Sequence, residues 1–119
     1  MIKINSISAI NCIVKDLDKT AEFYEALGLR FGKKESGILT FYVNWFSMNF
    51  FLPEDSTKSA VDNSSNGMFV YIKVDDVDEF YEFVLSKQLK PFTKPNDTVA
   101  GKREFVLKDP DGYNLVFFK

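Results

Sequence analysis

Residues 14–25 read VKDLDKTAEFYE, and residues 74–82 read VDDVDEFYE. The second stretch repeats the first about sixty residues later: a valine, an aspartate-rich segment and then EFYE. Self-similarity at a fixed spacing indicates that one supersecondary unit occurs twice, here a strand that leads into a helix. The repeat therefore predicts a protein built from two similar halves.

The elements around the first copy follow from hydropathy and from capping residues. Residues 6–14 alternate as in a strand that places its even-numbered side chains on one face. Asp18 is the expected N-cap of a helix that runs to about Leu27, where Gly28 supplies the stop. Further strands are expected at 29–34, 38–43 and 46–52, the last two joined by a turn at Asn44 and Trp45.

The second copy leads through the same order of elements. Residues 68–74 alternate as in a strand, and Asp76 or Asp78 caps a helix that runs to about Gln88. After this helix Pro91 is expected to open the next strand region, followed by a loop at 96–101 and a final hairpin with strands at 103–108 and 114–118. Each half is thus predicted to hold one strand, one helix and three further strands.

Charge and hydropathy exclude several classes of partner. The 119 residues carry 15 basic and 17 acidic side chains, a net charge of −2, with no basic block of the kind that binds nucleic acid. Residues 2–5 do not resemble a signal peptide, and no apolar run approaches membrane-spanning length. We therefore expect a cytoplasmic protein without nucleic-acid or membrane partners. The single cysteine, Cys12, is expected in the core.

Three features together resemble one known family. They are the paired order of elements, the strand-to-helix junction at 14–18 with Phe23 and Tyr24 behind it, and the turn DPDGY at 109–113. This combination resembles the glyoxalase, bleomycin-resistance and extradiol-dioxygenase superfamily, also called vicinal oxygen chelate proteins. The resemblance covers essentially all 119 residues.

The resemblance implies an α+β fold in which two tandem βαβββ modules form curved, cup-like mixed sheets with helices outside. One domain would then span residues 1–119, with modules at 1–53 and 68–119 and a linker at 54–67. Two chains commonly pair in this superfamily, so a homodimer is also expected.

Enzymes of the superfamily hold a divalent metal in the cup, and their ligand positions can be located in this sequence. They fall on Ala9, Asn49, Phe69 and Val116. Protein-bound divalent ions need imidazole, thiolate or carboxylate ligands, and this chain has no histidine at all. One amide oxygen, at Asn49, is a weak ligand. We therefore expect no metal, no cofactor and a binding protein more readily than an enzyme.

Strand alternation and the resemblance together suggest a ligand-binding lining of aromatic side chains with a few polar groups. The candidate residues are Asn11, Trp45, Asn49, Phe51, Phe69, Tyr71, Arg103, Glu104, Val116 and Phe118. The alternative is that these side chains fill the cup. Trp45 would stack on a ligand, pack across a dimer interface or cap the local core. Glu104, with Arg103 as counter-charge, would be a general base or hold a cationic ligand, or the two form a surface ion pair.

The preferred hypothesis is a metal-independent protein of the bleomycin-resistance type that sequesters a flat or apolar small molecule. The competing class is an enzyme: a metal-dependent lyase, isomerase or dioxygenase with atypical ligands such as Glu104 and Asn49, or a metal-free isomerase with Glu104 as its base. A regulatory module whose function is dimerisation is a further alternative. The aspartates near the two helix starts are assigned to capping rather than to metal binding.

Overall fold

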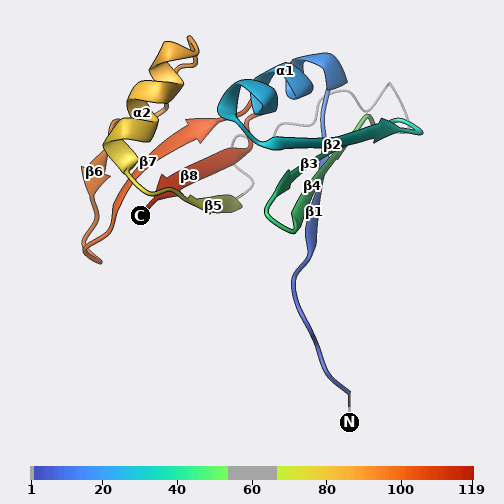
Figure 1. Ribbon diagram of the computed structural model, residues 1–119, viewed down its shortest axis with the longest axis horizontal. Coiled ribbons are helices and arrows are strands. Elements are labelled where there is room, and N and C mark those ends of the chain that lie inside the picture. The colour runs from blue at the N-terminus through green and yellow to red at the C-terminus, as the bar shows by residue number, and fades with distance from the viewer. Residues whose placement is uncertain (1, 54–66) are drawn as a thin grey trace. The chain divides into compact units, whose positions relative to one another are not determined.

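The computed structural model describes residues 2–53 and 67–119 (Figure 1). The chain forms two compact units, and we call their described parts unit 1 (2–53) and unit 2 (67–119). The predicted linker lies outside the described residues except for Gly67. Unit 1 contains β1 (Ala9–Ile13), α1 (Leu17–Leu27), β2 (Arg30–Glu35), β3 (Ile38–Val43) and β4 (Phe46–Phe51). Unit 2 contains β5 (Phe69–Lys73), α2 (Val77–Ser86), β6 (Asn96–Asp97), β7 (Arg103–Lys108) and β8 (Asn114–Phe118).

Each unit has one mixed sheet with the same topology. The strand order is β1-β4-β3-β2 in unit 1 and β5-β8-β7-β6 in unit 2. The first strand of each unit runs parallel to the last, and the other pairs are antiparallel. Both units therefore have the predicted βαβββ order, and the predicted α+β fold is confirmed.

In unit 1, α1 packs on one face of the sheet through aromatic rings. The ring of Tyr24 lies 4.7 Å from that of Phe50 and 6.0 Å from that of Phe41, and all three side chains are fully buried. Cys12 and Val14 are buried, as predicted. The odd-numbered side chains of β1 consequently face the opposite, open side of the sheet.

In unit 2, α2 lies along the sheet in the same way (Figure 1). The ring of Phe80 is 4.7 Å from that of Phe117 and 6.3 Å from that of Phe105. Val84, one turn further along α2, is fully buried. Each unit thus buries one face of its sheet under one helix, as in a two-layer domain.

The helix caps correct one sequence prediction. Asp16, not Asp18, is the N-cap of α1: its Oδ1 accepts hydrogen bonds from the backbone nitrogens of Asp18 (2.9 Å) and Lys19 (3.1 Å). Asp16 has the extended backbone that a cap requires, whereas Asp18 already lies in the first helical turn. Asp76 caps α2 in the same way. Gly28 ends α1 in the left-handed conformation, with φ 95°, as predicted.

Two further details differ from the sequence predictions. The strand region expected to open at Pro91 begins only at Asn96: residues 96–97, expected to lie in a loop, form the short strand β6 beside Arg103 and Glu104. The caps and first strands of the two units are sixty residues apart, but the two EFYE stretches are fifty-seven apart. Measured from the caps, Phe80 therefore takes the place of Thr20 rather than of Phe23.

The described part of the chain has no helix long and apolar enough to cross a membrane.

Candidate functional site

The open face of the unit 1 sheet carries a row of polar side chains across all four strands. Backbone register aligns Lys33 with Thr40, Thr40 with Asn49, and Asn49 with Asn11. We call these four residues the polar row. Neighbouring side chains on adjacent strands are close enough to interact directly. The row therefore forms a line of polar groups from one sheet edge to the other.

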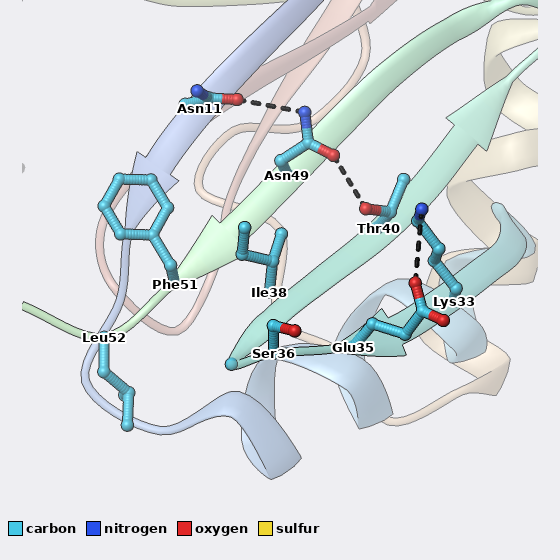
Figure 2. A pocket seen from close by; sticks show the side chains of 10 residues that line it. Asn11, Lys33, Glu35, Ser36, Ile38, Thr40, Asn49, Phe51 and Leu52 are labelled. Carbon is cyan, nitrogen blue, oxygen red and sulfur yellow. Dashed lines mark hydrogen bonds and ion pairs between the residues drawn. The ribbon is translucent and has the colours of Figure 1, made fainter.

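Hydrogen bonds connect three members of the polar row (Figure 2). The Thr40 hydroxyl donates to Oδ1 of Asn49 over 2.7 Å, and Nδ2 of Asn49 donates to Oδ1 of Asn11 over 2.9 Å. Only 3% of Thr40 is exposed, Asn49 is half-buried and Asn11 is exposed. The ladder thus satisfies a buried hydroxyl and runs outward to an accessible amide.

An open hollow of about 830 Å³ lies over the polar row and the next row of the sheet. Its volume falls within the range of small-molecule sites. Apolar side chains complete its wall, and Figure 2 shows them beside the polar row. The lining residues are Asn11, Lys33, Glu35, Ser36, Gly37, Ile38, Thr40, Asn49, Phe51 and Leu52.

The lining of the hollow from residues 2–53 carries no net charge. Its two charged side chains, Lys33 and Glu35, approach one another with 3.4 Å between Nζ and Oε2. Both side chains are mostly exposed, so the attraction between them is weak and screened by salt. The remaining lining residues are neutral, and hydrogen bonding and apolar contact dominate the chemistry of the hollow.

The hollow gathers three of the predicted ligand-binding residues: Asn11, Asn49 and Phe51. Trp45 is not among its lining residues. It lies in the predicted turn between β3 and β4, where 65% of it is exposed and its ring is 6.1 Å from that of Phe46. Sequence reasoning missed Thr40, although alternation along 38–43 puts this hydroxyl on the same face as Ile38 and Tyr42.

The open face of the unit 2 sheet holds most of the other predicted residues. Phe69 and Tyr71 are 54% and 56% exposed, and the Tyr71 ring packs edge-on against Phe118 at 5.6 Å. Nζ of Lys102 lies 5.1 Å from the centre of the Phe118 ring. Glu104 pairs with Phe118 in the register and is half-buried.

Arg103 has other partners than Glu104. Its Nε and Nη2 bind both carboxylate oxygens of Asp78, at 2.8 and 2.9 Å, and its Nη1 binds Asp97 at 3.1 Å. Hydrogen bonds from Arg103 lower the pKa of Asp78. This bidentate pair links the first turn of α2 to β7, which is a structural contact.

A family model supplies the wider classification. The model for the Glyoxalase/Bleomycin resistance protein/Dioxygenase superfamily matches residues 5–117. The chain belongs to this superfamily. No curated protein sequence matches it significantly.

Solved structures of the superfamily fold resemble the chain over its whole length. The bleomycin resistance determinant encoded on transposon Tn5 is 23% identical, with a TM-score of 0.77 over 97% of this chain and 98% of that one. A bleomycin-binding protein complexed with bleomycin is 23% identical, with a TM-score of 0.75 and 98% of both chains covered. A hypothetical protein from S. aureus is 20% identical, with a TM-score of 0.78 over 98% of this chain and 94% of that one. At these identities, the likeness establishes the fold.

The four positions that the sequence comparison aligned with metal ligands lie on the sheets of both units. Ala9 and Asn49 lie on the sheet of unit 1, and Phe69 and Val116 on that of unit 2, where Val116 is only 1% exposed. The hydrogen bonds of Asn49 to Thr40 and Asn11 engage both ends of its amide. Within 2–53 and 67–119, no three side chains of His, Cys, Asp or Glu come together to hold an ion.

Proposed function

We propose that this chain is a metal-independent member of the superfamily that binds and sequesters a flat, partly apolar small molecule. The observation that carries the proposal is the hollow in unit 1, which is large enough for such a ligand and combines a polar row with apolar walls. Phe51 and Ile38 offer the flat apolar surface, and the polar row offers groups that fix orientation.

The residue chemistry at the superfamily's metal positions supports metal independence. Alanine, phenylalanine and valine have no donor atom, and a single amide oxygen does not recruit a transition metal. The relative solved with bleomycin is a bleomycin-binding protein, and this chain shares its fold. Both facts favour binding over metal-assisted catalysis.

Calorimetry tests the proposal directly. Purified protein is titrated with a panel of flat bicyclic aromatic compounds, before and after treatment with EDTA. Phe51→Ala is expected to weaken binding about tenfold, because an aromatic contact on the ligand is lost. Phe92→Ala is the matched control, since Phe92 is an exposed phenylalanine of unit 2 that does not line the hollow.

The outcomes separate the hypotheses. Unchanged affinity after EDTA supports metal independence. Binding or turnover that appears only on addition of Mn, Fe, Ni or Zn would overturn it in favour of the enzyme alternatives. Absence of binding for the whole panel would contradict the proposed function.

We also propose that the chain forms a homodimer in the cytoplasm. In each described sheet the first strand, β1 or β5, is an edge strand, and edge strands are common sites of pairing between chains. Sedimentation velocity is expected to give a mass of about twice 13.7 kDa. A single species at the monomer mass across a wide concentration range would exclude the dimer. Cell fractionation tests the location.

A further inference from the structure

The hydrogen-bond ladder of the polar row leaves an excess of donors at its outer end. A primary amide has two N–H groups and one carbonyl oxygen. Asn49 uses its carbonyl oxygen for Thr40 and one N–H for Asn11, so a second N–H remains. Asn11 uses its oxygen to accept that bond, and its own Nδ2 has no partner among the described residues.

The unused N–H groups belong to amides on adjacent strands that are directly opposite in register. Both amides line the hollow. A donor facing a ligand without an acceptor costs free energy, because its bond to water is not replaced. The ladder therefore selects a ligand that brings an acceptor oxygen to the Asn11 end of the row.

The charge of the hollow decides which acceptor is preferred. Lys33 and Glu35 carry opposite charges 3.4 Å apart, and no other ionisable side chain of residues 2–53 lines the hollow. An anionic ligand would lose hydration without gaining an unpaired cation. A cationic ligand would face the N–H groups of Asn11, which donate hydrogen bonds and cannot accept them. A neutral carbonyl satisfies the donors at the smallest desolvation cost.

We propose that the hollow of unit 1 takes a flat, neutral compound bearing a carbonyl group, whose oxygen accepts hydrogen bonds from Nδ2 of Asn11 and Nδ2 of Asn49. The apolar body of the compound lies over Phe51 and Ile38, in the row beside the amides. This inference rests on the proposed function and specifies the ligand class of the same site.

Matched probes with one naphthalene body and different head groups test the inference. They are methyl naphthyl ketone, naphthoate, naphthylmethylammonium and ethylnaphthalene, measured by equilibrium dialysis against the full chain. The ketone is expected to bind about tenfold more tightly than each of the other three, which is the effect of one well-made hydrogen bond.

One isosteric variant reverses the head-group preference. Asn11→Asp replaces the donor nitrogen with an oxygen, and the other oxygen still accepts from Asn49. The ketone is expected to lose about tenfold in affinity while the ammonium probe gains by a similar factor. Asn5→Asp is the control, because it adds the same charge at an exposed position outside the hollow and is expected to change neither affinity.

Each result has a defined meaning. A preference for naphthoate or for the ammonium probe in the wild type would overturn the carbonyl assignment while leaving the proposed function intact. Unchanged ketone affinity in Asn11→Asp would do the same. Failure of all four probes to bind would contradict both the carbonyl assignment and the proposed function.

Discussion

The open faces of the two sheets share one register and differ in chemistry. In unit 1 the central row contains Thr40, Asn49 and Asn11, which form a hydrogen-bonded ladder. The corresponding row in unit 2 contains Val106, Val116 and Tyr71, which have no amide or carboxylate. One backbone arrangement therefore carries a hydrogen-bonded polar row in one unit and a row of two valines and a tyrosine in the other.

The sheet faces under the helices are aromatic in both units. Phe50 and Phe117 occupy matching positions on the last strand of each unit, and each packs against an aromatic ring of its helix. The comparison indicates that core packing fixes the backbone, while the open face is free to take on a binding chemistry. This division explains why the fold alone does not specify a ligand.

The largest effect is expected from removing the buried rings that pack under the helices in both units. Phe50→Ala and Phe117→Ala each remove a fully buried ring and should each lower the free energy of unfolding by about 4 kcal/mol. Urea denaturation followed by circular dichroism measures both. Similar losses support equivalent half-cores, whereas a loss below about 1 kcal/mol in either variant would show that they are unequal.

Exchanging the central rows should have the next largest effect. Val116→Asn buries an amide in a row that has no ladder and should cost about 2–3 kcal/mol. Asn49→Val leaves the buried Thr40 hydroxyl without its acceptor and should cost about 1–2 kcal/mol. Both costs are measured by urea denaturation.

A double variant checks this interpretation. Adding Thr40→Val to Asn49→Val removes both ends of their hydrogen bond and should restore most of the lost stability. Additive losses in the double variant would mean that the ladder does not couple the two side chains.

A smaller effect, an increase in stability, is expected from a substitution in α1. The Thr20 hydroxyl is buried in α1 without a hydrogen-bond partner in the described structure, whereas the same place in α2 holds Phe80. Thr20→Val keeps the shape and removes the unpaired hydroxyl, so it should raise the free energy of unfolding by about 1 kcal/mol. Thermal denaturation measures the gain, and a lower melting temperature would contradict it.

The smallest effect concerns equivalent ion pairs at the helix starts. Asp78 binds Arg103 through two hydrogen bonds, whereas the ion pair of Asp18 in the described structure is a single contact with Lys34, at 3.3 Å. Arg103 lowers the pKa of Asp78 in the folded state, so the pair stabilises the protein above the ordinary aspartate pKa of about 3.9. This contribution is lost as the pH falls through the lowered pKa.

Melting temperatures therefore provide the measurement. Asp78→Asn should be less stable than the wild type at about pH 6, and the difference should shrink as the pH falls toward about 2. Asp18→Asn, the matched control, should change less because its single exposed contact is weaker. A difference for Asp78→Asn that persists unchanged at low pH would assign the loss to something other than the charge pair.

Much of the fold could be predicted from the sequence. Alternating hydropathy located β3, β7 and β8 at the residues where they occur, and Gly28 marked the end of α1. The Asp18 cap was wrong because two aspartates, Asp16 and Asp18, lie at the start of α1, and only backbone conformation selects between them. The strand β6 was placed too early, from Pro91, because its two residues carry no hydropathy pattern that would locate it.

The site was less accessible to sequence reasoning. Periodicity placed Asn11 and Asn49 on open faces, but their hydrogen bond depends on which residues are opposite in register. Thr40 was missed for the same reason, because its contribution to the site is a hydrogen bond to Asn49 on the neighbouring strand. Arg103 was expected beside Glu104, but adjacent residues of a strand point to opposite faces.

The three-residue difference between the two EFYE stretches matters for protein engineering. Three residues correspond to about 4.5 Å along a helix and to most of one turn. A chimera that grafts α2 into unit 1 by matching EFYE to EFYE would place its rings about one turn out of step with the sheet beneath. Grafts between the units must instead be aligned on Asp16 and Asp76, which set where each helix begins.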